Sequence, residues 1–447
     1  MRQFGRRLED VPLVEGTARP AAETAVAKPD VGLQLRLRSK IMEHLDSSVI
    51  AEMSPDVLRH ELEPVIHQIA DLERVQLSAL DQAQLAQDLT DDMIGFGPLE
   101  PLLRDDSISD IMVNGPNAVF IEVAGKLKKS PMHFRDTDHA ATVAQKMVAT
   151  VGRRIDESSP LCDARLPDGS RVNVIFPPLA LDGPCISIRK FTKKKLDFAG
   201  MVENGSMVPA VAHLLEIAAR SRCNILISGG TGSGKTTLLN ALSRWISHDE
   251  RVITIEDAAE LQLQQPHVVR LETRTANLEG RGEINQRALL RNALRMRPDR
   301  IIVGEVRGTE AYDMLQAMNT GHDGSISTVH ANTTRDALSR VENMVQMATT
   351  NLPARAIRAQ IASAIDLIIQ IERMRDGVRR VTQISDICGM EGDVVTMNDV
   401  VSFRFESEDH NGNILGGYRA TLVRPSFETR LAYFGLDKAW IEATQSL

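Results

Sequence analysis

The stretch that most constrains this chain is ILISGGTGSGKTT, residues 225–237. Its first three residues are apolar and indicate a buried strand, and TLLNAL continues after the glycines at helical spacing. Glycines let backbone N–H groups approach phosphates closely, and the N-terminus of the following helix adds a positive dipole end. The pattern GxxxxGK[ST] over residues 229–236 therefore predicts a nucleoside triphosphate site, the alternative being a glycine turn without a ligand.

Two side chains at the start of the expected helix have distinct roles. Lys235 would reach the β- and γ-phosphates, and the hydroxyl of Thr236 would bind Mg²⁺. ATP and Mg²⁺ are therefore the expected cofactors. The expected nucleotide-binding residues of this segment are Gly230, Thr231, Gly232, Ser233, Gly234, Lys235, Thr236 and Thr237.

Composition limits the partners and the compartment. The 52 basic and 60 acidic residues give a net charge of −8, which argues against nucleic acid as a partner. The four cysteines form no C-x-x-C pair, as is usual in a reducing cytoplasm. The longest apolar stretch, IASAIDLIIQI, is short and contains Asp366, so we expect no membrane-spanning helix. Any contact with a membrane would then pass through a partner protein.

The composition and the periodicity of the chain change several times along its length. Residues 1–30 are rich in Pro, Ala, Glu and Thr and indicate a disordered tail, either plainly solvated or a tether for a partner. Residues 31–92 have helical periodicity and predict a three-helix bundle, in which Pro64 should kink or interrupt the second helix. Residues 93–191 predict an α+β domain, residues 192–207 a linker, and residues 208–447 an α/β nucleotide-binding domain.

Short apolar runs define the two larger domains. In the first they alternate with turns, and Gly125 and Gly169 supply the backbone freedom for two hairpins around a helix at about residues 137–151. In the second, five runs alternate with helical stretches and predict a largely parallel sheet covered on both faces. These five runs are NILISG, VITIED, HVVRLE, RIIVGEV and GSISTVHA.

Acidic residues end two of these strands. Glu305 lies at the end of the apolar run in RIIVGEV and is suited to hold Mg²⁺ through water or to orient an attacking water. Glu256 and Asp257 end VITIED and are a second candidate. A solvated cap is the alternative for either position alone. Two acids after strands of the same sheet favour the catalytic interpretation.

Histidines and arginines complete the candidate site. His322 and His330 flank a Gly/Ser/Thr-rich loop where a γ-phosphate could be sensed, and they lack the spacing of a zinc site. Arg274 and Arg281 lie in an irregular polar segment and are candidates to compensate phosphate charge, with a surface ion pair as the alternative.

Four blocks together resemble the secretion and pilus ATPases of the type II/type IV secretion superfamily. They are GGTGSGKTT (Walker A), ITIEDAAELQL (Asp box), LRMRPDRIIVGEVRG (Walker B) and TGHDGSISTVHAN (His box). The block GFGPLEPLLRDDSISDIMVNGP and the strand SIRKF also look like the N-terminal domain of that superfamily. The chain is most similar to the CpaF family of tight-adherence (Tad) pilus motors, over roughly residues 90–390.

This resemblance implies a RecA-like P-loop domain preceded by a PAS-like α+β domain and a small helical bundle, assembled as a homohexameric ring. ATP turnover would drive assembly of a pilus through an inner-membrane platform protein. A pilus localisation factor is a candidate partner of the N-terminal tail. Glu305 would be the catalytic acid, assisted by Glu256, and His330 would sense the γ-phosphate. Arg165, Arg171 and Arg189 would face ATP and close the site.

Other functions share some of these sequence features with a pilus motor. The ATPase of a conjugative type IV secretion system has the same mechanism and a different cargo, and the helical region 31–92 favours the pilus motor over it. A RecA-like nucleic-acid translocase lacks support in the acidic composition. A GTP-dependent switch is disfavoured, because the chain has no N-K-x-D segment for recognising guanine. The chain also lacks the cysteine quartet of the zinc-binding general-secretion branch. An ATP-binding regulator without turnover is the remaining alternative.

Overall fold

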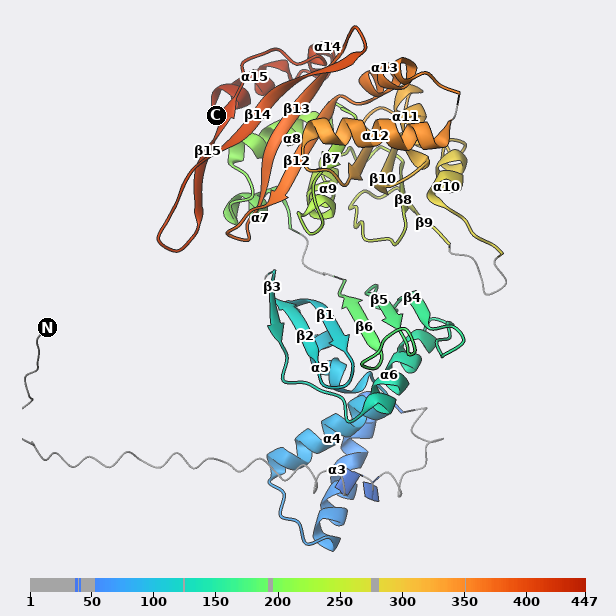
Figure 1. Cartoon of the computed structure of the whole chain (residues 1–447). Helices are drawn as coiled ribbons and strands as arrows, with labels where there is room; N and C mark the ends of the chain where they lie inside the picture. The colour runs from blue at the N-terminus through green and yellow to red at the C-terminus, as the bar shows by residue number, and fades with distance from the viewer. Residues whose placement is uncertain are drawn as a thin grey trace, which may run out of the picture. The chain divides into compact units, whose positions relative to one another are not determined.

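A computed structural model describes residues 37–38, 40–41, 53–123, 125–191, 196–274, 281–349 and 351–447. It divides into two compact units, Met1–Glu100 and Pro101–Leu447, which we describe separately (Figure 1). The expected tail over residues 1–30 lies outside the described residues, as does most of the first expected helix of the bundle.

The first unit is helical. Among its described residues the elements with given bounds are α3 (Pro55–Leu72), α4 (Ala79–Met93) and the short 3₁₀ helix η1 (Gly97–Leu99). Ser54 caps α3 ahead of a proline at the first helical position, and Ser78 forms a capping box with Asp81 at the start of α4. The apolar faces of the two helices are buried against each other and against Leu37 and Ile41.

Pro64 was expected to kink or interrupt its helix. It does not interrupt the helix, because α3 is continuous from Pro55 to Leu72. Pro64 removes one backbone donor, and the carbonyl left without its helical partner belongs to His60. Both residues are exposed, so water can hydrogen-bond to that carbonyl. The cost of the proline is therefore small enough for the packing of the buried face to outweigh it.

The second unit begins with an antiparallel sheet of order β3-β2-β1-β6-β5-β4 and one long helix. Gly125 and Gly169 have φ of 76° and 93° and lie in the β2–β3 and β4–β5 turns, which confirms the two expected hairpins. The expected helix is confirmed as α6. The elements are α5 (Glu100–Arg104), β1 (Ile108–Asn114), β2 (Val119–Val123), β3 (Lys126–Lys129), α6 (Thr137–Ala149), β4 (Leu161–Arg165), β5 (Arg171–Ile175) and β6 (Cys185–Arg189).

The rest of the second unit is built on a sheet of nine strands in the order β15-β14-β13-β12-β7-β11-β10-β8-β9. From β12 to β9 every neighbouring pair is parallel, so the carboxyl ends of these strands lie at one edge. The strands are β7 (Ile225–Ser228), β8 (Val252–Glu256), β9 (Val268–Glu272), β10 (Arg300–Val306), β11 (Ile326–Val329), β12 (Leu367–Arg373), β13 (Arg379–Glu391), β14 (Val394–Glu408) and β15 (Ile414–Ala420).

Helices cover both faces of this sheet (Figure 1), because alternate strand residues enter two separate hydrophobic cores. Ile225 and Ile227 of β7 belong to one core, and Leu226 belongs to the other. The first core contains residues of α7 (Phe198–Glu203), α8 (Pro209–Arg220), α9 (Lys235–Ser243), α14 (Glu428–Tyr433) and α15 (Asp437–Gln445). The second contains residues of α10 (Gln286–Ala293), α11 (Glu310–Asn319), α12 (Thr334–Ala348) and α13 (Ala354–Ala364).

The molecule is therefore an α/β protein with a doubly covered, mixed sheet preceded by an α+β sheet and a helical unit. The five predicted strands are confirmed as β7 to β11, but the antiparallel strands β13 to β15 were not expected. Part of the expected linker is the helix α7, whose Phe198 and Met201 are buried in the first core.

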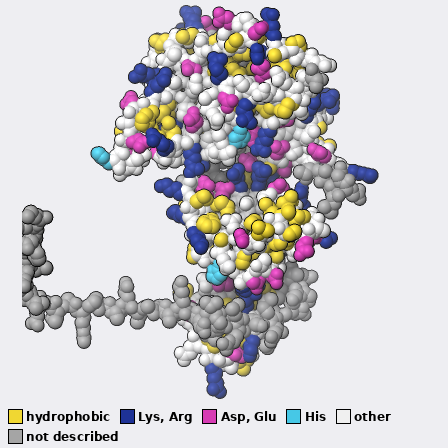
Figure 2. All heavy atoms as spheres, in the orientation of Figure 1, with side chains coloured by type: hydrophobic (Ala, Val, Ile, Leu, Met, Phe, Trp, Pro, Cys, Tyr) yellow, Lys and Arg dark blue, Asp and Glu magenta, His cyan; other side chains and the backbone are white. Residues whose placement is uncertain are grey.

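No helix in the described part of the chain has the length and apolar content that crossing a membrane requires. On the face shown in Figure 2, Lys and Arg side chains are interspersed with Asp and Glu. A positive stripe of the kind that binds a nucleic-acid backbone is not visible on that face.

Candidate nucleotide site

The glycine-rich loop joins the end of β7 to the start of α9 at the carboxyl edge of the parallel strands. Gly232 and Gly234 have φ of 69° and 101°, a backbone conformation that side chains with a Cβ disfavour. Gly229 is needed for a different reason, since a Cβ on it would lie 2.3 Å from the carbonyl oxygen of Ile371. The loop glycines thus satisfy separate local constraints, and β12 closes one side of the loop.

The other expected loop residues line the same turn. A Cβ on Gly230 would meet no atom within 4 Å. Thr231 is exposed and Ser233 is buried. Thr236 and Thr237 are partly buried in the first turn of α9, whose N-terminal N–H groups favour an anion.

Lys235 is the first residue of α9, and its ammonium group is buried in the site. Its Nζ donates to the carbonyl oxygens of Gly229 at 2.9 Å and Gly230 at 3.1 Å. The same nitrogen lies 3.8 Å from Oε1 of Glu305 and 3.4 Å from Nε2 of His330. Burial lowers the pKa of Lys235, and the carboxylate of Glu305 acts in the opposite direction. The cation is thus held at the loop by two carbonyls and one acid.

Glu305 and His330 meet because of the strand order. β11 lies between β7 and β10, and Val306 of β10 pairs with Val329 of β11. This register places His330, directly after β11, with Nε2 at 2.7 Å from Oε1 of Glu305. Burial lowers the pKa of His330, while the neighbouring carboxylate favours its charged form. Three residues far apart in sequence therefore converge within 4 Å of one another at the carboxyl edge.

Arg307 completes this cluster and was not assigned a role from sequence. It lies two residues after Glu305, donates to Oε2 of that carboxylate through Nε at 2.7 Å, and lies 3.9 Å from Oδ2 of Asp257. The signal that could have found it is the spacing of two along a strand, which puts both side chains on the same side.

Oxygen donors suited to Mg²⁺ are present beside the loop. The hydroxyl of Thr236 makes no hydrogen bond within the described residues, so its oxygen is available to a cation. The Glu305 carboxylate lies 3.8 Å from Nζ of Lys235, the residue adjacent to Thr236. Mg²⁺ usually takes only one or two protein ligands and completes its shell with water and phosphate oxygens, so this donor set fits it. Thr236 would ligate the ion directly and Glu305 through water.

Glu256 ends β8 and is buried. Its Oε2 accepts backbone N–H groups from Glu260 at 2.7 Å and Leu261 at 2.9 Å, which fold the Asp-box loop around it. Its Oε1 is buried without a hydrogen-bond partner among the described residues. Burial raises the pKa of Glu256 to about 7, with the two N–H groups opposing the shift. The residue organises the loop and also carries a proton-binding group close to neutrality.

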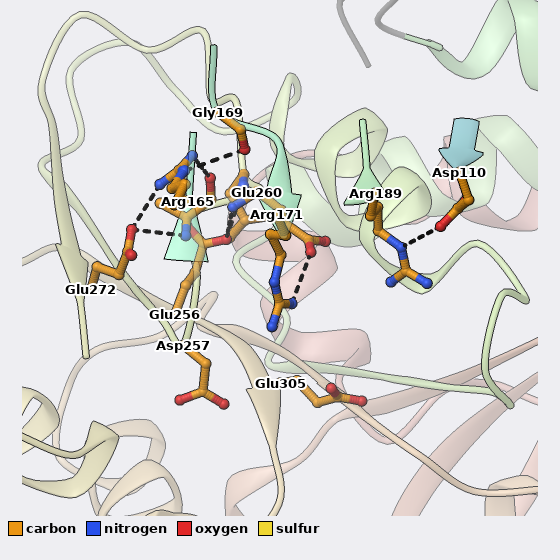
Figure 3. A network of polar contacts seen from close by, with 12 residues as sticks. Asp110, Arg165, Gly169, Arg171, Arg189, Glu256, Asp257, Glu260, Glu272 and Glu305 are labelled. Carbon is orange, nitrogen blue, oxygen red and sulfur yellow. Dashed lines mark hydrogen bonds and ion pairs between the residues drawn. The ribbon is translucent and has the colours of Figure 1, made fainter. Parts of the chain in front are cut away.

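The three arginines predicted to close the site form one row across the N-terminal sheet, because Arg165 pairs with Arg171 and Arg171 with Arg189 in register. Two of them reach the Asp-box region (Figure 3). Arg165 donates to Glu272 at 2.7 Å and to the carbonyl of Ala259, and Arg171 donates to Glu260 at 3.3 Å.

Arg189 does not reach it. Its guanidinium donates instead to Asp110 of β1 at 3.2 Å, within its own sheet (Figure 3). Arg274 lies just after β9, where it forms a bridge with Ile284 and donates to the carbonyl of Gly282 at 2.6 Å. Arg281 lies at the other side of this short bridge. The hydrogen bonds and ion pairs given for Arg189 and Arg274 do not include the P-loop.

Several known proteins are similar to this chain over most of their length. A protein of Mycobacterium tuberculosis (strain H37Rv) named for conjugal transfer is 39% identical over 312 residues, which cover 68% of this chain and 88% of that protein. The conjugal transfer protein TrbB of Rhizobium radiobacter is 37% identical over 292 residues, or 64% and 86% of the two chains. The crystal structure of the VirB11 ATPase of the Brucella suis type IV secretion system is 30% identical, covers 64% of this chain and 94% of that one, and has a TM-score of 0.35.

The family of type II/IV secretion system proteins matches residues 92–395, which contain the P-loop, both acidic strand ends and His330. The names of the relatives point to conjugal transfer and type IV secretion, so the expected membership holds at the level of this family and not specifically for the Tad pilus branch. The chain belongs to the type II/IV secretion system protein family.

Proposed function

We propose that this protein hydrolyses ATP and uses the energy to drive a secretion or conjugation machine. The observation that carries the proposal is the convergence of Lys235, Glu305 and His330 at the mouth of the P-loop. A loop alone would support binding only. A carboxylate beside the phosphate-binding lysine adds the group that hydrolysis requires.

Each residue then has a role in phosphoryl transfer. The loop N–H groups and Lys235 bind the β- and γ-phosphates, and Glu305 orients the attacking water. His330, whose Nε2 lies 2.7 Å from Oε1 of that carboxylate, responds to the γ-phosphate. Bound Mg²⁺ would supply charge neutralisation between the phosphates.

Glu256 and the arginines act at the rim of the site. Glu256 fixes the Asp-box loop, and Arg165 and Arg171 hold that loop from the N-terminal sheet. In a closed state these two arginines, with Arg189, Arg274 or Arg281 of the same or a neighbouring subunit, would compensate phosphate charge.

We assign the machine first to conjugative type IV secretion, because several of the relatives are named for conjugal transfer or type IV secretion. The active form would be a homohexamer at an inner-membrane platform protein, and the protein itself would not bind nucleic acid. A Tad pilus motor is the second candidate. The helices α3 and α4 support it, since almost all of that unit lies outside the matched residues 92–395.

Two substitutions test turnover. Lys235→Ala should abolish binding of a fluorescent ATP analogue, and Glu305→Gln should retain binding while phosphate release falls by a factor of about 100 or more. The exposed residues Lys438 and Glu406 provide controls with the same changes, Lys438→Ala and Glu406→Gln. Native turnover in Glu305→Gln would refute the assignment of the acid, and ATP binding without phosphate release by the unaltered protein would favour a regulator.

The ring and the cargo need separate tests. Light scattering with an ATP analogue should show a species of about six chains, and a monomer under all nucleotide conditions would refute the ring. Stimulation of turnover by DNA would favour a nucleic-acid translocase instead. Deleting the gene and scoring conjugation against piliation decides between the two machines.

A further inference from the structure

We propose that Arg379, at the start of β13, is a positioning residue that orients the P-loop and adds positive charge for the triphosphate of ATP. The proposal rests on the proposed function, because it concerns the same nucleotide. Arg379 lies outside all four blocks that carry the family resemblance, and no sequence pattern pointed to it.

The first argument is direct contact. Nε of Arg379 donates to the carbonyl oxygen of Gly232 at 3.0 Å. Its Cδ lies only 3.2 Å from the position that a Cβ on Gly234 would occupy, so the side chain runs along the loop. Carbonyl oxygens that turn toward a phosphate repel it. A cation that binds one of these carbonyl oxygens holds it away from the phosphate and favours the orientation in which the N–H groups face the ligand.

The second argument is an unusual pairing. Arg373 of β12 and Arg379 of β13 are directly opposite each other in the antiparallel ladder, so both side chains leave the sheet on the same face. Like charges at such a position destabilise a sheet. Among the described residues neither forms an ion pair with a carboxylate, and the partners given for them are carbonyl oxygens, that of Gly125 for Arg373 and that of Gly232 for Arg379.

An anion would relieve this repulsion, and the site that the pair borders is the phosphate loop. Arg379 is exposed, and only Nε of its guanidinium has a hydrogen-bond partner within the described residues. Its remaining N–H donors are free to bind phosphate oxygens in the forked geometry that arginine favours. Neutralisation of the like-charged pair would then be coupled to nucleotide binding.

The same turn supplies a matched control. Arg375 lies two residues after Arg373, is exposed, pairs with Glu408 at 2.7 Å and lies over the ring of Phe405. It carries the same charge and has no contact to the P-loop among the interactions given for it. Arg375→Gln therefore removes one positive charge from the turn without removing the proposed contact.

The experiment measures affinity and turnover in the full-length protein. Arg379→Gln should raise the Kd of a fluorescent ATP analogue and the KM for ATP about tenfold, the size expected for one charge-assisted hydrogen bond, while kcat changes less than about twofold. Arg379→Lys, which keeps the charge, should recover part of the affinity. Arg375→Gln should bind as the unaltered protein does. Without nucleotide neither substitution should destabilise the fold, because both side chains are exposed and loss of Arg379 removes its repulsion with Arg373.

Two results would overturn the inference. One is a Kd for Arg379→Gln within about twofold of the unaltered protein. The other is an equal loss in Arg375→Gln, which would show a general effect of charge. Failure of the unaltered protein to bind ATP would instead refute the proposed function, and the two failures are distinguished by this parent measurement.

Discussion

Gly229→Ala tests whether the P-loop depends on its packing against β12. An added Cβ would lie 2.3 Å from the carbonyl oxygen of Ile371 and 2.5 Å from Oγ of Ser233. Ordinary contacts of this kind are about 3.4 Å, so the loop or the strand must move by about 1 Å in a close-packed region. Overpacking of this size costs about 1–3 kcal/mol. For a domain of this size the loss corresponds to a fall in melting temperature of about 2–6 °C.

The neighbouring glycine is the control. A Cβ on Gly230 would meet no atom within 4 Å, so Gly230→Ala should change the free energy of unfolding by less than about 0.5 kcal/mol. Both variants are melted without nucleotide and followed by circular dichroism or calorimetry. Binding of an ATP analogue is then measured, and Gly229→Ala should lose affinity because its loop is displaced. Equal melting temperatures for the two variants would refute the packing argument.

Three further outcomes follow from the structure. Burial raises the pKa of Glu256 from 4.5 to about 7, so between these pH values the folded protein keeps a proton that the unfolded chain has released. The free energy of unfolding should therefore fall as pH rises through this window, by at most about 3 kcal/mol. Glu256→Gln should remove this pH dependence from denaturation curves measured at several pH values. Gly324→Ala, at φ of 85° and with its Cβ 2.6 Å from the guanidinium of buried Arg300, should cost about 2 kcal/mol or more in calorimetry, and an unchanged melting temperature would contradict this. Arg171→Gln should leave the melting temperature unchanged, because the pair with Glu260 is partly exposed, while steady-state kcat falls; an unchanged kcat would remove Arg171 from the site.

Local patterns were sufficient for the elements that position the nucleotide. The glycine run, the apolar strand before it and the helix after it are close in sequence, so one motif predicts the loop. Glu305 and His330 were found because each follows an apolar strand, and parallel strands deliver their carboxyl ends to one edge.

Features that depend on register or distant packing were not predictable in this way. Arg165, Arg171 and Arg189 look alike in sequence and form one row, yet only the first two reach the Asp-box region. The acid partner of Arg189 comes from β1, about 80 residues away, and pairing between distant strands leaves no local signal. The contact of Arg379 with the P-loop was missed for the same reason.

Strand β13 also has a mechanical consequence. It begins with Arg379 at the phosphate loop and runs antiparallel to β12, so that Asp386 lies beside Leu367 at the opposite edge of the sheet. Thirteen residues of extended chain span about 43 Å. Its far end adjoins α13, where Arg358 donates to the carbonyl of Asp393. Strand β13 therefore runs from the phosphate loop to the remote side of the domain, and a rotation of about 5° at the loop would displace its far end by at most about 4 Å.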